Sequence, residues 1–135
     1  MKTYCGKISI IGRPNVGKST FLNHAIGHKI SITTRKAQTT RRQIRGIYTD
    51  ECRQIIFIDT PGLNAKVGRR QNRQLNQQAL TSLADIDVVL LMVERNKWSA
   101  EDDWILERLK TVAGPVVAVI NKIDQLTPDK IDTIY

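Results

Sequence analysis

Aromatic residues are scarce in this 135-residue sequence, where they make up 5% of the positions. A base-stacking platform of the kind found on RNA-binding sheets needs exposed aromatic side chains, so the composition argues against one. Cysteine is scarce too, and Cys5 and Cys52 have neither a CxxC spacing nor a metal-ligand spacing. We interpret both as reduced thiols of a cytosolic protein.

Long apolar runs are missing as well. None reaches the ~18 residues that a membrane-spanning helix needs, and the first six residues open no apolar region of a signal peptide. The expected location is therefore the cytoplasm.

Acidic residues are outnumbered: 13 Asp and Glu face 21 Lys and Arg, which gives a formal net charge of +8. Such an excess favours polyanionic partners such as RNA or an anionic membrane surface. A basic soluble protein without such a partner is an equal alternative.

Short aliphatic runs at 7–11, 86–93 and 115–120 predict buried strands. Residues 41–49 and 53–59 predict two antiparallel strands joined by a turn.

Helical patterns separate these strands. Helices are expected from Lys18 to a terminating Gly27, over 71–83 and 100–112, and from Pro128 onward. The alternation predicts an α/β fold, with a mainly parallel sheet, helices on both faces and one antiparallel hairpin strand.

The most specific motif is G-x-x-x-x-G-K-S, between the first predicted strand and the first predicted helix, which makes the predicted fold that of a P-loop NTPase. Its residues are Gly12, Arg13, Pro14, Asn15, Val16, Gly17, Lys18 and Ser19. Glycines allow the backbone to approach phosphates, and a helix N-terminus attracts anions. We expect Lys18 to contact the terminal phosphates and Ser19 to bind Mg2+.

A second motif, N-K-x-D, follows the strand predicted at 115–120, where open α/β sheets bind ligands. The Asp124 carboxylate can accept both adjacent donors of guanine, a pair that adenine lacks. We expect Lys122 to pack along the base and tie the loops together, and Asn121 to support the phosphate loop.

A third motif, D-T-P-G-L, follows the strand at 53–59. Its residues are Asp59, Thr60, Pro61, Gly62 and Leu63. The aspartate can hold Mg2+, and the glycine amide can contact the gamma-phosphate. Alone, the same letters describe an ordinary turn.

The basic segment at 35–42 contains the expected switch threonine. Thr40 is the preferred Mg2+ ligand and Thr39 the alternative. The segment is either a solvated loop or a surface that GTP orders and that meets RNA phosphates.

Leu63 stands where many GTPases place a glutamine that orients the attacking water. Leucine cannot hydrogen-bond to water, so intrinsic turnover should be slow unless another group positions the water. Asn15 is a candidate ligand for K+, which could act like an arginine finger. The alternative is a simple loop role.

These motifs in this order resemble the bacterial Era family of translation-factor-related GTPases. The matching stretches are G-R-P-N-V-G-K-S, T-R-K-A-Q-T-T-R, D-T-P-G-L and N-K-I-D. The resemblance covers nearly the whole chain and implies a GTPase of small ribosomal subunit assembly that uses GTP, GDP and Mg2+. Family members bind small-subunit ribosomal RNA mainly through a following KH domain and can associate peripherally with the inner membrane. A monomer is expected.

The chain departs from that family's pattern at its end. It stops at Tyr135, before the family's fifth motif, the last strand and helix of the domain, and the KH domain. Residues 1–135 are therefore interpreted as a partial Era-type GTPase domain. The strand at 116–120 should then be a sheet edge with an uncovered apolar face.

Alternatives stay open. A truncated module that binds nucleotide or RNA without significant turnover is favoured by Leu63 and the missing motif. A P-loop ATPase or kinase is disfavoured by residues 121–124. A related GTPase of tRNA modification or ribosome assembly is disfavoured by the segment at 35–42.

Overall fold

The computed structural model of this chain describes residues 2–27, 43–59, 77, 80–95 and 97–131. No helix among these residues is both long and apolar enough to cross a membrane.

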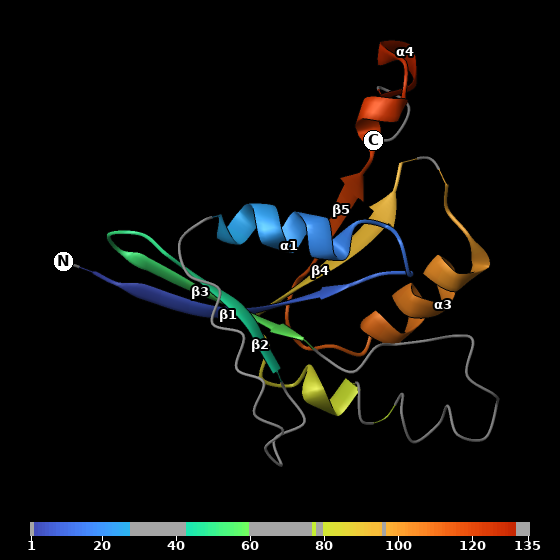
Figure 1. The fold of residues 1–135 in the computed structure, drawn as a ribbon. Helices are drawn as coiled ribbons and strands as arrows, with labels where there is room; N and C mark the ends of the chain where they lie inside the picture. Colours follow the sequence, from blue (N-terminus) through green and yellow to red (C-terminus); the bar gives the residue numbers. More distant parts are fainter. Residues whose placement is uncertain (1, 28–42, 60–76, 78–79, 96, 132–135) are drawn as a thin grey trace.

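Within the described residues, a five-stranded sheet forms the centre of the fold (Figure 1). Its strands are β1 (Tyr4–Ile11), β2 (Gln43–Thr49), β3 (Arg53–Asp59), β4 (Val88–Glu94) and β5 (Val116–Asn121), in the spatial order β2-β3-β1-β4-β5. Among the strands that the structure describes, β2 and β3 pair antiparallel and the other three pairings are parallel. The predicted mainly parallel sheet with one hairpin strand is confirmed.

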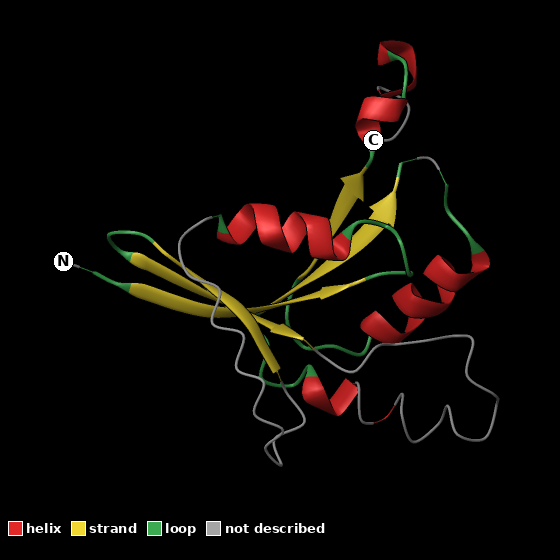
Figure 2. Cartoon of the chain, in the orientation of Figure 1, coloured by secondary structure: helices red, strands yellow, loops and turns green. Residues whose placement is uncertain are grey.

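Helices connect and flank the strands (Figure 2). They are α1 (Lys18–Ile26), α3 (Ala100–Leu109), a short 3-10 helix η1 (Ile123–Gln125) and α4 (Pro128–Ile131). Most of the helix predicted over 71–83 lies outside the described residues, although residues 77 and 80–82 are helical.

The two faces of the sheet pack against different helices. Ile105 and Leu109 of α3 join a buried cluster with Ile58, Val89 and Leu91 of the strands. Successive strand side chains point to opposite faces, so Phe57, the neighbour of Ile58, points away from that cluster.

Helix α1 covers the opposite face. Gly46 of β2 is paired with Phe57, and the δ-carbon of Ile26 occupies the space where a Gly46 side chain would lie. Helices therefore cover both faces, as the alternation of strands and helices predicted.

The starts of β1 and β4 and the end of α3 differ from the predictions, and the remaining described strand ends of β4 and β5 are shifted by one residue. β1 begins at Tyr4 rather than at residue 7, because Tyr4 to Ser9 pair in register with β3. β4 begins at Val88 rather than at residue 86, because the Asp87 side chain accepts the Lys7 amide at 2.7 Å. α3 ends at Leu109 rather than at 112, and the turn after it still brings Val112 against the core.

In the described part of the chain β5 is an edge strand, as predicted. Val116 is 36% exposed and Val117 is 47% exposed. The early half of this strand thus presents an uncovered apolar surface, while its end at Asn121 is partly covered.

Candidate nucleotide-binding site

The loop at 12–17 joins the end of β1 to the start of α1. Asn15 has φ 65° and Gly17, the N-cap residue of α1, has φ 101°, so two left-handed residues turn the chain back on itself. In the described residues no side chain caps α1, and its first turn contains no acidic residue. The free amides at the start of the helix therefore favour an anion such as phosphate.

At both glycines of the motif, neighbouring groups leave no room for a side chain. A β-carbon on Gly12 would overlap the carbonyl oxygen of Met92 in β4, and one on Gly17 would overlap the Asn121 side-chain amide. The loop is consequently pressed against the carboxyl ends of β4 and β5.

Lys18 folds back over the same loop. Its ammonium group donates to the carbonyl oxygens of Gly12, at 2.7 Å, and of Arg13, at 2.5 Å. This places the positive charge at the loop, where phosphate oxygens could replace those carbonyl oxygens as acceptors of the ammonium hydrogen bonds.

The predicted base-reading residues lie directly beside the phosphate loop. Asn121 Nδ2 donates to the Val16 carbonyl at 2.8 Å, and Lys122 Nζ donates to the Asn15 carbonyl at 2.8 Å. The expected support from Asn121 and the expected tie through Lys122 are both present in this geometry. Asp124 is exposed in η1, as a residue that reads a bound base must be.

Glu94 was not predicted from the sequence and lies at the centre of this arrangement. Its carboxylate is 3.4 Å from Lys122 Nζ, 3.6 Å from Lys97 Nζ and 3.9 Å from Arg95 Nε. Partial burial by itself raises the pKa of Glu94, but the charges of Lys122, Lys97 and Arg95 outweigh this and hold the pKa below its ordinary value. The ionised carboxylate thus steadies the lysine that ties the two loops.

Arg13 was predicted as a nucleotide-contacting residue, yet its side chain is directed elsewhere. Arg13 Nε is 2.8 Å from Asp102 Oδ2 at the start of α3, and Arg13 Nη2 donates to the Lys97 carbonyl at 2.8 Å. These two contacts direct the side chain toward α3, while its backbone stays in the phosphate loop. Asp102 could have been noticed in the sequence, because Ser99 precedes it by three residues in the spacing of a capping box.

The predicted magnesium ligands lie at or after the carboxyl ends of two adjacent parallel strands. Ser19 is exposed in the first turn of α1, after β1, and Asp59 is the last residue of β3, which pairs with β1. Hydroxyl and carboxylate oxygens suit Mg2+, so this donor set fits the ion. Their binding role stays a prediction. The other predicted positions lie outside the described residues: Thr39, Thr40, Thr60, Pro61, Gly62 and Leu63.

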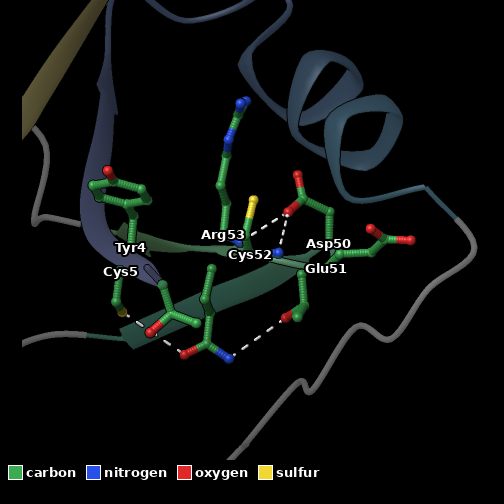
Figure 3. A pocket seen from close by; sticks show the side chains of 9 residues that line it. Tyr4, Cys5, Asp50, Glu51, Cys52 and Arg53 are labelled. Atoms are coloured by element: carbon green, nitrogen blue, oxygen red, sulfur yellow. Dashed lines mark hydrogen bonds between the residues drawn. The ribbon is translucent and has the colours of Figure 1, made fainter. Parts of the chain in front are cut away.

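A hollow of about 330 Å3 lies at the far end of the sheet from the phosphate loop. Figure 3 shows the side chains that line it. It is lined by the start of β1 and by the turn between β2 and β3, where Asp50 accepts the amides of Cys52 and Arg53. The Cys52 amide is the main reason that the pKa of Asp50 lies below its ordinary value. Ligands of open α/β sheets bind at the carboxyl ends of the strands, so this hollow is not the nucleotide site.

The chain matches a family of known proteins over most of its length. The family model described as 50S ribosome-binding GTPase matches residues 7–122. GTPase Era of Haemophilus ducreyi is 52% identical over 125 residues, which are 93% of this chain and 41% of that relative. GTPase Era of Yersinia pestis is 50% identical over 126 residues, with 93% and 42% covered.

Solved structures agree with these sequence matches. An Era variant of Aquifex aeolicus bound to GDP.AlF4− superposes with a TM-score of 0.70 at 38% identity, covering 99% of this chain and 47% of that one. Era in complex with MgGDPNP and a segment of 16S ribosomal RNA superposes with a TM-score of 0.71 at 37% identity, with 98% and 47% covered. The chain thus spans less than half of the length of each of these relatives.

Proposed function

Since this chain belongs to the family of 50S ribosome-binding GTPases, we propose that it is a switch domain of Era type that binds GTP and GDP and slowly hydrolyses GTP. The observation that carries this proposal is the pair of side-chain hydrogen bonds from Asn121 and Lys122 to the phosphate loop. They join a phosphate cradle to a guanine-reading tetrad within one site.

Guanine selection is assigned to Asp124. Its carboxylate is a double acceptor that matches the two adjacent donors of guanine. Adenine would leave that charge without a partner, and sites built on polar readout reject such analogues strongly. Lys122 is expected to pack along the base.

Hydrolysis is proposed as in-line attack of water on the gamma-phosphate. Lys18 and the loop amides stabilise the negative charge that develops on the transferred group, and the Gly62 amide contacts it. Ser19, Asp59 and Thr40 would hold Mg2+, which neutralises phosphate charge when bound. Leu63 cannot orient the water, so intrinsic turnover is slow.

Asn15 is proposed as a ligand for K+. Its left-handed backbone is equally what the turn itself requires, because asparagine tolerates this conformation. Replacing K+ with Na+ in the turnover assay separates the two roles.

The complete protein is proposed to act in small ribosomal subunit assembly, in the cytoplasm and as a monomer, with peripheral contact to the inner membrane. Support comes from the Era relatives and from the solved Era complex with 16S ribosomal RNA. RNA contact would depend mainly on the part of those relatives that this chain does not match.

A second candidate is a module that binds nucleotide without turning it over. The exposed apolar half of β5 favours it, because an incompletely covered edge loosens the strand that leads to the base-reading loop.

One set of assays tests both functions. GTP turnover is measured in KCl and in NaCl, with Lys18→Ala as the control, and ATP is tested as a competitor of GTP. Turnover that Lys18→Ala abolishes supports the enzyme. Tight GDP binding without turnover in either salt supports the second candidate, and equal competition by ATP contradicts the guanine selection assigned to Asp124.

A further inference from the structure

The Arg13 side chain leaves the phosphate loop and is held at the start of α3. The guanidinium group contacts the Asp102 carboxylate through Nε at 2.8 Å and the Lys97 carbonyl through Nη2 at 2.8 Å. The Arg13 side chain is 19% exposed and that of Asp102 is 0% exposed. The pair is therefore largely withdrawn from water.

Within the described residues, Arg13 is the cation that pairs with Asp102. Its Oδ2 atom accepts the amide of Ser99 at 2.9 Å and the Ser99 hydroxyl at 3.0 Å, and both donors are neutral. Its buried Oδ1 atom accepts no hydrogen bond within the part of the chain that the structure describes. A buried carboxylate needs a charged partner, and the Arg13 guanidinium supplies that charge through the ion pair at Nε.

Arg13, which pairs with Asp102 through its side chain, also binds Lys18 through its backbone carbonyl. The Arg13 carbonyl accepts the Lys18 ammonium at 2.5 Å, and the preceding carbonyl, of Gly12, accepts it at 2.7 Å. Fixing the Arg13 side chain therefore fixes the stretch of backbone that sets the position of the phosphate-binding lysine.

We propose that Asp102 is a positioning residue for the phosphate loop, acting through Arg13. Asp102 keeps the loop in the curve that presents Lys18 and the helix amides to phosphate. It also joins the nucleotide site to the start of α3. This inference rests on the guanine-nucleotide binding proposed above.

Asp102 also caps α3, and this role alone predicts a different result. Loss of a helix cap lowers stability whether or not Arg13 is present. A positioning role predicts that Asp102 stops mattering to nucleotide release once Arg13 is gone. A double-mutant cycle on nucleotide dissociation therefore separates the two roles.

The experiment measures release of a fluorescent N-methylanthraniloyl derivative of GDP into excess GDP. The variants are Asp102→Asn, Arg13→Ala and the double variant. Asp103→Asn is the matched control, because this exposed neighbour binds the Trp98 indole at 2.7 Å instead of Arg13. Unfolding of each variant is followed by circular dichroism.

Each single variant is expected to release nucleotide roughly tenfold to a hundredfold faster, within the range of coupling between side chains that share one ion-pair network. The double variant should release it no faster than the faster single variant, and Asp103→Asn should stay within about twofold of the parent. An equal effect of Asp102→Asn with and without Arg13 would overturn the inference.

If Asp102→Asn does not fold, the Arg13 variants test the positioning role without it. Faster release from Arg13→Ala, partly restored in Arg13→Lys, supports the inference, and release from Arg13→Ala at the parent rate overturns it. A parent chain that binds no derivative contradicts the proposed function as well. A parent that binds while its variants release normally contradicts the positioning role only.

Discussion

Gly17 is expected to be the most informative glycine of the phosphate loop, because an added methyl group would meet two separate obstacles. Its backbone is left-handed, with φ 101°. A β-carbon there would also overlap Asn121 Nδ2, the atom that donates to the Val16 carbonyl at 2.8 Å. Gly17→Ala should therefore both strain the backbone and displace the hydrogen bond that joins the two loops.

The expected loss of unfolding free energy in Gly17→Ala has a contribution from each of these two causes. The left-handed conformation costs an L-residue roughly 1–2 kcal/mol, and the lost hydrogen bond about 1 kcal/mol. Gly17→Ala should then lower the free energy of unfolding by about 2–3 kcal/mol. In the Asn121→Ala background the hydrogen bond is already absent, so only the strain of about 1–2 kcal/mol should remain.

Urea unfolding without nucleotide, followed by circular dichroism, measures all four corners of this cycle. The expected coupling between Gly17→Ala and Asn121→Ala is about 1 kcal/mol. Gly27→Ala is the control: Gly27 also has a positive φ, of 62°, but a β-carbon there would meet nothing within 4 Å. Its effect should add to that of Asn121→Ala. Full additivity for Gly17→Ala as well would refute the proposed contact.

Three further predictions follow from the same packing and charges. Gly12→Ala should lower the free energy of unfolding by about 3 kcal/mol, measured by urea unfolding, because its β-carbon would meet the rigid carbonyl of Met92. Gly46→Ala should cost only about 1 kcal/mol in the same assay, since the Ile26 δ-carbon can rotate away; an equal or larger loss than in Gly12→Ala would contradict this. Glu94 has a lowered pKa, so its stabilising effect is present above its unfolded pKa and is lost as the pH falls through the folded value. Acid unfolding curves should therefore be steeper below about pH 4 for the parent than for Glu94→Gln, and parallel curves would contradict the role of Glu94.

Most of the fold could be predicted because its signals are local. Aliphatic runs marked β4 and β5, and the polar turn at Asp50 marked the hairpin of β2 and β3. Exact boundaries depended on tertiary contacts. The start of β4 is one case, since the Asp87 side chain takes the place of a backbone partner for the Lys7 amide.

The candidate site also contains residues that local sequence signals could predict and residues that depend on tertiary contacts. Residues fixed by motif and spacing, such as Asn121 and Lys122, lie against the phosphate loop as expected. The direction of the Arg13 side chain could not be predicted, because its partner Asp102 is far away in the sequence and is brought beside it only by the tertiary fold. Glu94 was missed for a similar reason. A single acidic residue at a strand end does not indicate an ion pair until the fold places Lys122 beside it.

The most direct test of guanine-nucleotide binding is the affinity of this chain for GDP and for xanthosine diphosphate, with and without Asp124→Asn. Titration calorimetry with the parent should show tight binding of GDP and weak binding of the xanthosine nucleotide. Asp124→Asn should reverse that order, because xanthine replaces a donor of guanine with an acceptor that an amide can meet. A folded parent chain that binds neither nucleotide, or an Asp124→Asn variant that still prefers GDP, would contradict the account.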